Sequence, residues 1–174
     1  MKTLKTEQLY QGKFLSVEKR TLENNQVREV VTMKDAVACI VTNKEKTKLI
    51  MVKQYREPAK QECWEIPAGM LDVDGESPEN AMLRELEEEA HLKLNSATKF
   101  ITYFANIGSC THQVSIYETS VSNDCNFDEE VITDDNDVTE KKWFSLEELK
   151  VMIDNNEIID GKTIISILKL LGNL

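Results

Sequence analysis

The segment from residue 65 to 92, EIPAGMLDVDGESPENAMLRELEEEAHL, constrains the fold of this chain more than any other segment does. It begins with a loop rich in small residues. Ser77 and Pro78 follow, an N-cap residue and a proline that suits the first helical position. The helix that begins there has charged side chains at five of the six positions from Arg84 to Glu89. The segment therefore predicts a loop that delivers the chain to an acidic helix.

Three carboxylates share one face of this predicted helix, because Glu85, Glu88 and Glu89 are three and four residues apart. A bound cation would relieve their mutual repulsion, and Mg²⁺ or Mn²⁺ suits oxygen ligands and keeps water for substrate phosphates. An ordinary solvated acidic face is the alternative. Gly69 favours the metal site, because a glycine lets the loop backbone turn its carbonyls toward a metal.

The length and the net charge of the chain limit the kind of domain it can form and the partners it can bind. The 174 residues suffice for one domain with a hydrophobic core. The net charge of −10 argues against a general electrostatic grip on nucleic acid or an anionic membrane. The N-terminus lacks the apolar run of a signal peptide, and no segment is apolar enough to span a membrane. We therefore expect a cytoplasmic protein with neither a membrane nor a nucleic-acid partner.

The spacing of the cysteines also favours the cytoplasm. They are far apart and form no CxxC pair: Cys39, Cys63, Cys110 and Cys125. This spacing predicts reduced, mostly buried thiols. A zinc site that combined them with His91 or His112 would lack the paired ligand spacing typical of such sites.

The pattern of apolar and polar residues predicts strands joined by polar connections. The predicted strands are 12–22 and 27–33, which form a hairpin, then 36–41, 49–52, 64–67, 98–105, 113–121 and 141–144. Residues 57–63 and 122–137 are predicted to be loops. Ser145 opens a helix to about residue 155, and Glu148 completes its capping box. A last helix, 162–171, has a predicted core face of Ile164, Ile165, Leu168 and Leu171.

The acidic helix and its loop resemble the box of the Nudix hydrolases, G-x5-E-x7-R-E-U-x-E-E-x-G-U, where U is bulky and aliphatic. Gly69 opens the match, Glu76 follows, and residues 84–92, RELEEEAHL, complete it. There are two departures. Six residues rather than five separate Gly69 from Glu76, and His91 replaces the last glycine, which ends the helix in a left-handed conformation. The resemblance implies an α/β fold, the Nudix α/β/α sandwich with a mixed sheet.

The same resemblance implies a metal site. Glu85 and Glu89 would be ligands together with the backbone carbonyl of Ala68. Glu88 would be a further ligand or a general base, and Arg84 would orient the carboxylates. The implied cofactor is Mg²⁺ or Mn²⁺.

Fragments outside the box resemble the ADP-ribose pyrophosphatase branch of that family, namely YQGK at 10–13, REVV at 28–31, QYR at 54–56 and WEIPAG at 64–69. In that branch a small N-terminal antiparallel sheet helps to form a dimer whose active sites draw on both subunits. The resemblance therefore implies a homodimer, with residues 1–35 as the dimerising sheet region and 36–174 as the Nudix domain. It also implies a substrate pocket lined by Arg28, Glu29, Arg56, Met70 and Gly108.

The branch carries its catalytic base on an acidic loop before the last strand. Alignment back from residues 141–145 puts Asp135 at the base position and Asp137 at a further metal contact. Many relatives have glutamate there, and aspartate is one methylene shorter. Glu88 is the alternative base, and simple solvation of the loop is the alternative role for these aspartates.

The resemblance implies metal-dependent hydrolysis of the pyrophosphate bond of ADP-ribose to AMP and ribose 5-phosphate. Other nucleotide sugars, such as GDP-mannose or ADP-glucose, are alternative substrates. A nucleotide-sugar-binding protein without turnover is the alternative function. The longer loop, His91 and Ile107, which stands where a proline is common, favour that alternative. The intact residues of the box oppose it: Arg84, Glu85, Glu88 and Glu89.

Overall fold

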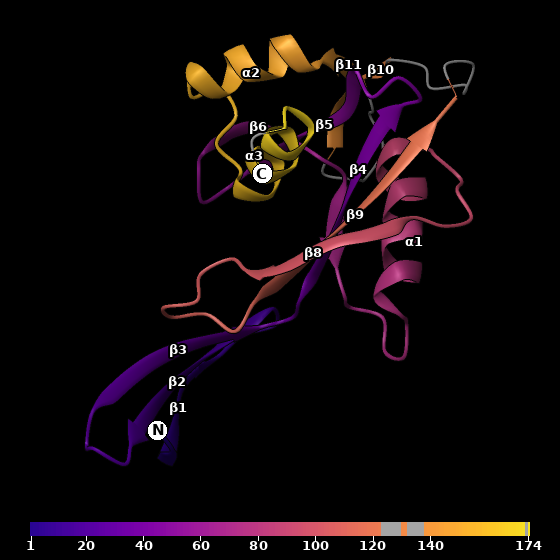
Figure 1. Cartoon of the computed structure of the whole chain (residues 1–174). Coiled ribbons are helices and arrows are strands. Elements are labelled where there is room, and N and C mark those ends of the chain that lie inside the picture. The colour runs from indigo at the N-terminus through magenta and orange to yellow at the C-terminus, as the bar shows by residue number, and fades with distance from the viewer. Residues whose placement is uncertain (123–129, 132–137, 173) are drawn as a thin grey trace.

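The computed structural model of the chain describes residues 1–122, 130–131, 138–172 and 174. Three antiparallel strands form a small N-terminal sheet that projects from the rest of the chain (Figure 1). They are β1 (Thr3–Gln11), β2 (Leu15–Leu22) and β3 (Val27–Met33). The predicted hairpin is confirmed as β2 and β3. The polar first strand was not predicted.

The remaining strands form a mixed sheet with the order β10-β11-β5-β4-β9-β8, in which β6 pairs with β5 and β7 with β4. The strands are β4 (Ala36–Asn43), β5 (Lys48–Arg56), β6 (Gln61–Glu65), β7 (Ala68–Met70), β8 (Thr98–Phe104), β9 (Gln113–Val121), β10 (Glu130–Val131) and β11 (Val138–Ser145). β4 and β9 run parallel, whereas the other recorded pairings are antiparallel. The predicted mixed sheet is confirmed.

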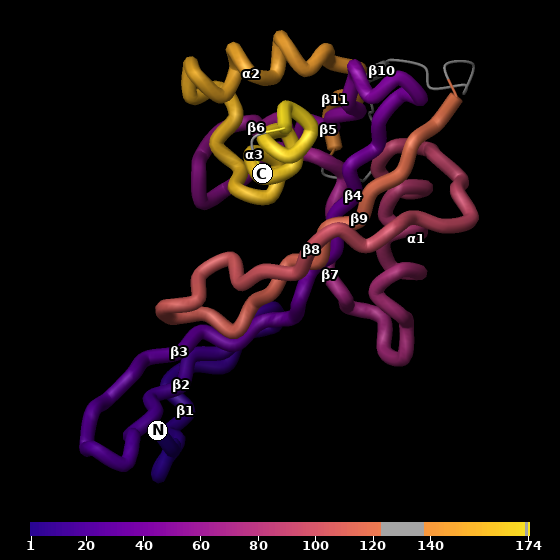
Figure 2. The backbone as a smooth tube through the Cα atoms, in the orientation of Figure 1, coloured from indigo at the N-terminus to yellow at the C-terminus, as the bar shows by residue number. Residues whose placement is uncertain are grey.

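Helices cover both faces of this sheet. They are α1 (Pro78–Ala90), α2 (Leu146–Asp154) and α3 (Gly161–Leu170). Alternate residues of β4 face opposite ways, as in any strand. Val37 and Cys39 join a core with Leu86 of α1, whereas Ala38 joins a second core with Ile167 of α3. The arrangement is the predicted α/β/α sandwich, and Figure 2 shows the loop that connects β7 to the start of α1.

The predicted helix starts are confirmed by their caps. The Ser77 hydroxyl accepts a hydrogen bond from the backbone N–H of Asn80, at 3.2 Å. Ser145 and Glu148 form the predicted reciprocal capping box. At the end of α1, His91 takes the left-handed conformation, with φ of 54°, and Leu92 donates back to the carbonyl of Leu86. The helix thus ends as a glycine would end it, on a residue for which that conformation costs about 1 kcal/mol.

Two predictions of local structure were wrong in part. Residues 61–63 belong to β6 rather than to a loop, because they pair with the long β5. Three residues of the predicted core face of α3, Ile164, Ile165 and Leu171, pack partly buried against the core. The most buried residues of the helix are instead Thr163, Ser166 and Ile167. The two hydroxyls can be buried because local bonds satisfy them: Thr163 bonds Asp160, and Ser166 donates to the carbonyl of Lys162.

The N-terminal sheet has no fully buried side chain. Backbone hydrogen bonds join it to the loop between β8 and β9, where Val31 donates to Ser109 and accepts from Thr111, at 2.8 and 2.9 Å. The last residues of β3 therefore reach the mixed sheet while most of the small sheet extends away from it (Figure 1). Across the described residues, no helix combines the length and the apolar character needed to cross a membrane.

Candidate functional site

Glu89 of α1 is a buried carboxylate, with only 9% of the residue exposed. One of its oxygens accepts a hydrogen bond from the backbone N–H of Ala68 on β7, at 2.9 Å, and the other accepts from the side-chain amide of Gln54. Burial raises the pKa of Glu89 to about 7; these two bonds oppose the shift, and the charge of Glu85 adds to it. Ionised Glu89 therefore sits where a nearby cation would stabilise it.

Glu85 packs directly against the backbone of Gly69. A β-carbon built at residue 69 would lie 1.9 Å from the carboxylate carbon of Glu85, which is far inside van der Waals contact. The first glycine of the box therefore leaves room for the carboxylate of Glu85, which a side chain at residue 69 would displace, and it is not explained by an unusual backbone angle. Burial raises the pKa of Glu85, the contact with Arg84 opposes the shift, and the charge of Glu88 adds to it.

Arg84 ties the acidic residues of the loop and the helix together. Its guanidinium lies 2.8 Å from Glu85, 3.1 Å from Glu88, 3.2 Å from Glu76 and 3.4 Å from Asp72. Partial burial would lower the pKa of Arg84, but the bond to Glu76 and the neighbouring negative charges raise it overall. Arg84 thus stays charged and contacts the carboxylates that it was predicted to orient; the orienting role itself stays a prediction.

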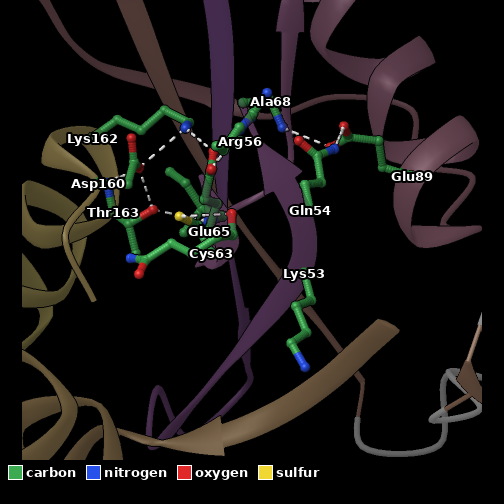
Figure 3. Close-up of polar contacts among 12 residues, drawn as sticks. Lys53, Gln54, Arg56, Cys63, Glu65, Ala68, Glu89, Asp160, Lys162 and Thr163 are labelled. Carbon is green, nitrogen blue, oxygen red and sulfur yellow. Dashed lines mark hydrogen bonds and ion pairs between the residues drawn. The ribbon is translucent and has the colours of Figure 1, made fainter. Parts of the chain in front are cut away.

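A second group of charged residues gathers around Glu65 at the end of β6 (Figure 3). Arg56 donates to both oxygens of Glu65, at 2.6 and 2.7 Å, and Lys162 of α3 lies 2.5 Å from one of them. The Glu65 side chain is only 3% exposed. Burial would raise the pKa of Glu65, but the two cations outweigh it and lower that pKa.

Asp160 connects this group to the start of α3. Its carboxylate accepts from the N–H and the hydroxyl of Thr163, at 3.0 and 2.6 Å, and lies 3.1 Å from the ammonium of Lys162. The Thr163 hydroxyl in turn accepts from the backbone N–H of Ile66, at 3.0 Å. These bonds fix the first turn of α3 beside the end of β6.

A cavity of about 370 Å³ lies beside the group around Glu65 and beside the β7 residues that contact the acidic helix. It is lined by Met33, Ala36, Arg56, Ala68, Gly69, Met70, Tyr103, Ala105, His112, Val114, Asp160, Gly161 and Lys162. Three residues predicted from the sequence, Arg56, Ala68 and Met70, therefore meet in one cavity. Since Glu85 contacts Gly69 and Glu89 contacts Ala68, the wall of the cavity is also the support of the acidic helix.

Other predicted substrate residues lie outside this cavity within the single chain. Arg28 and Glu29 are exposed on β3, where the guanidinium of Arg28 donates to Val27 and Gln26. Gly108 lies in the loop after β8 and donates to the side chain of Asn106, at 3.2 Å. His112, at the end of that loop, does line the cavity and contacts the carbonyl of Lys34, at 2.6 Å.

The predicted base Asp135 and the predicted metal contact Asp137 lie outside the described residues. Within the residues that are described, no three His, Cys, Asp or Glu side chains are arranged to hold one metal ion by themselves. Glu85 and Glu89 instead contact neighbouring residues of β7, Gly69 and Ala68, and each is held by separate hydrogen-bond partners. The described cysteines, Cys39, Cys63 and Cys110, are free thiols.

Sequence reasoning missed Glu65, Asp160, Lys162 and Tyr103 as parts of this site. Glu65 lies inside the WEIPAG fragment, which was a usable signal. Lys162 had none, because 97 residues separate it from Glu65 in the chain.

Comparison with known proteins identifies the family. A family model for the NUDIX domain matches residues 32–165, from the end of β3 into α3. This chain belongs to the Nudix family. The acidic helix α1 and the loop before it are its Nudix box, and Gly69, Arg84 and Glu85 are box residues whose contacts have just been described.

Two relatives match this Nudix protein over most of their length. ADP-ribose pyrophosphatase of Bacillus subtilis (strain 168) is 34% identical over 169 residues, 93% of this chain and 88% of the relative. The methanol dehydrogenase activator of Bacillus methanolicus is also 34% identical, over 95% of this chain and 90% of its own. Family and relatives together indicate an enzyme, a Nudix pyrophosphohydrolase.

A solved structure described as an ADP compounds hydrolase aligns with a TM-score of 0.73 and 16% identity, over 99% of this chain and 96% of that one. At this identity the match concerns the fold. It covers the small N-terminal sheet as well as the Nudix sandwich.

Proposed function

We propose that this chain hydrolyses the pyrophosphate bond of ADP-ribose, or of a closely related nucleoside diphosphate sugar, in a metal-dependent reaction. With ADP-ribose, water adds across the bond and gives AMP and ribose 5-phosphate. One observation carries the proposal: the cavity that presents Arg56 shares its Ala68–Gly69 wall with Glu85 and Glu89 of the Nudix box. A diphosphate held in the cavity would therefore lie beside the box carboxylates.

The residues present fit a divalent cation. Glu89 is buried with its charge disfavoured, and Gly69 makes room for the carboxylate of Glu85 against the backbone. Glu85, Glu89, the carbonyl of Ala68 and Asp137 would hold Mg²⁺ or Mn²⁺, with water and substrate phosphates as the remaining ligands. When bound, such an ion neutralises charge on the phosphates and lowers the pKa of a bound water.

Side chains of the protein would bind the phosphates, orient the carboxylates and accept the proton. Arg56 offers a planar set of donors suited to phosphate oxygens. Arg84 holds Glu85 and Glu88 in orientation, at 2.8 and 3.1 Å. Either Glu88 or Asp135 would accept a proton from the attacking water.

We also propose that the protein is a homodimer that pairs through residues 1–35. The N-terminal sheet supports this, because large apolar side chains on it are exposed: Leu4, Leu9, Tyr10, Phe14, Leu15 and Val27. A three-stranded sheet with no buried face is unstable alone and calls for a covering surface. Pairing of this kind would carry Arg28 and Glu29 toward the pocket of the second subunit. The free thiols Cys39 and Cys63 support a cytoplasmic location for this dimer.

The direct test is to incubate the purified protein with ADP-ribose and Mg²⁺ or Mn²⁺ and to measure AMP release, beside the variant Glu89→Gln. We expect metal-dependent release that falls by about 100-fold or more in the variant, because the substitution removes a metal ligand from a preorganised site. GDP-mannose and ADP-glucose, tested in parallel, identify the preferred nucleotide sugar.

Two results would overturn parts of this proposal. Release from another nucleotide sugar but not from ADP-ribose would keep the reaction and change the substrate. Binding of these compounds with no turnover in either metal would instead support the alternative, a Nudix protein that binds nucleotide sugars without hydrolysing them.

A further inference from the structure

Two cations from distant parts of the chain converge on Glu65, which is nearly inaccessible to solvent (Figure 3). Arg56 comes from the end of β5 and Lys162 from the first turn of α3. Their side chains are 41% and 12% exposed, so both are partly withdrawn from water. Lys162 stands at a helix N-terminus, where the helix dipole disfavours a cation. Intrinsic helix stability therefore does not explain a lysine at this position.

Charge neutralisation of Glu65 does not explain Lys162 either. Arg56 already gives Glu65 a two-pronged ion pair, with one bond to each oxygen. Asp160, the other acid beside Lys162, caps α3 by accepting from the N–H and the hydroxyl of Thr163. Replacing a whole buried ion pair by apolar residues is often neutral for stability, so this network is weak evidence that Lys162 is kept for stability alone.

Both cations retain hydrogen-bond donors after these contacts. A guanidinium has five N–H donors, of which Arg56 uses two on Glu65. An ammonium has three, of which Lys162 uses one on Glu65 and one on Asp160. Phosphate oxygens are the acceptors that such remaining charged donors bind best.

The two side chains also stand where two cavities meet. Both line the cavity of about 370 Å³ that contains Ala68 and Gly69. Both also line a neighbouring cavity of about 300 Å³, whose other walls include Pro58 and Ile159. A diphosphate links two larger groups, so it requires space on both sides of the residues that bind it. The junction at Arg56 and Lys162 meets this requirement.

We propose that Lys162 binds the substrate diphosphate together with Arg56, and that Glu65 is the positioning residue that holds both cations at the junction of the two cavities. This proposal rests on the proposed function for the identity of the substrate. It adds a substrate contact from α3, an element outside the Nudix box.

The test compares Lys162→Met, Lys162→Arg and Lys169→Met. The last is a matched control, because Lys169 lies on the same helix and pairs with Glu118, away from the cavity. Titration calorimetry in EDTA measures the Kd of ADP, which carries the diphosphate but no second sugar. Loss of a charge-assisted bond predicts a Kd about 10- to 100-fold weaker for Lys162→Met. Lys162→Arg should recover most of the affinity, and Lys169→Met should match the wild type.

Steady-state kinetics with ADP-ribose separates binding from chemistry. A contact made equally in the ground and transition states predicts a KM raised about 10-fold or more in Lys162→Met, with kcat changed by less than about threefold. Glu65→Gln tests positioning: in that background, Lys162→Met should weaken ADP binding by less than it does in the wild type, since the two residues act together.

Unchanged ADP affinity and KM in a folded Lys162→Met variant would overturn the proposal, as would failure of ADP to bind the wild type. The two proposals fail separately. If the wild type binds ADP through Lys162 but does not hydrolyse ADP-ribose, the proposed substrate is wrong and the role of Lys162 stands. If ADP-ribose is hydrolysed and Lys162→Met behaves as Lys169→Met does, only the role of Lys162 is wrong.

Discussion

The balance of acidic and basic side chains differs between the two sides of β7. On the α1 side, Arg84 is surrounded by Asp72, Glu76, Glu85 and Glu88, and acids outnumber the cation that contacts them. On the α3 side there are two cations, Arg56 and Lys162, and two acids. The acids are Asp160 and the nearly inaccessible Glu65. The first side leaves negative charge for a metal to balance. The second is balanced and still offers donors. A metal-bound diphosphate between them would satisfy both.

The largest effect on activity is expected from Gly69→Ala, which acts on the acidic side of β7, the side that faces α1. The new methyl group would collide with the carboxylate of Glu85, so that the side chain must leave its place. We expect turnover to fall by about 100-fold, as for loss of an electrostatic contact in the site. Steady-state assays across metal concentration measure it.

The double variant Gly69→Ala/Glu85→Ala serves as the control for that effect. If the collision is the cause, removing the carboxylate should restore most of the thermal stability that Gly69→Ala loses, without restoring activity. A Gly69→Ala enzyme of normal activity would show that Glu85 need not lie against β7.

The next effect is expected on the basic side, from Arg56→Lys. Lysine keeps the charge but loses the planar pair of bonds to Glu65 and the donors beside it. We expect KM to rise about 10-fold with a smaller change in kcat, measured by steady-state kinetics. Arg20→Lys is a matched control, because Arg20 binds Glu18 through the same two nitrogens in the N-terminal sheet. Equal effects of the two variants would contradict a special role for Arg56.

The two sides should also respond oppositely to pH in metal-free protein. Burial raises the pKa of Glu89 to about 7, so its stabilising contribution is complete below its unfolded pKa near 4.5 and is lost as pH rises through 7. Burial opposes but does not prevent the lowered pKa of Glu65, so its contribution is present above about 4.5 and is lost as pH falls through the folded pKa.

Thermal unfolding in EDTA between pH 5 and 8 tests the part of this contrast that concerns Glu89. Relative to Glu89→Gln, the wild type should lose on the order of 2 kcal/mol of unfolding free energy across that range. Mg²⁺ or Mn²⁺ at pH 8 should restore stability to the wild type and not to the variant. Parallel curves of unfolding free energy against pH for the two proteins would show that the pKa of Glu89 is not raised as expected.

The smallest effect is expected at the end of α1, from His91→Gly. Glycine adopts the left-handed conformation of residue 91 without a steric penalty. We expect the free energy of unfolding to rise by about 0.5–1 kcal/mol, reduced by loss of the contact with Lys141. Asn25→Gly, at a similar φ in the hairpin turn, should gain less because asparagine tolerates that conformation. Chemical denaturation measures both, and destabilisation by His91→Gly would contradict the expectation.

Local signals in the sequence predicted the parts of the molecule that depend on neighbours along the chain. The caps at Ser77 and Ser145 and the α1 helix are set by residues within four positions of one another, whereas the left-handed end at residue 91 was expected from the family pattern. The strand at residues 61–63 was missed because its polar side chains show no alternation, and pairing with β5 decides its conformation.

The basic side of the site lay beyond the reach of such signals. Its central bond joins Glu65 to Lys162 across 97 residues, and the hydroxyls of Thr163 and Ser166 are buried only because Asp160 and a helix carbonyl accept from them. Spacing along the chain predicts neither. Resemblance to a family supplied Arg56 and Met70, which meet in the cavity.

The most direct test of the account measures whether the two sides of β7 act on one ligand. The probe is an ADP-ribose analogue with a methylene in place of the bridging oxygen, titrated with and without Mn²⁺. We predict that Mn²⁺ tightens the Kd of the analogue by about 10-fold or more, that the analogue tightens Mn²⁺ binding by the same factor, and that Glu89→Gln abolishes the coupling. Equal affinity for the analogue with and without Mn²⁺ would contradict the account.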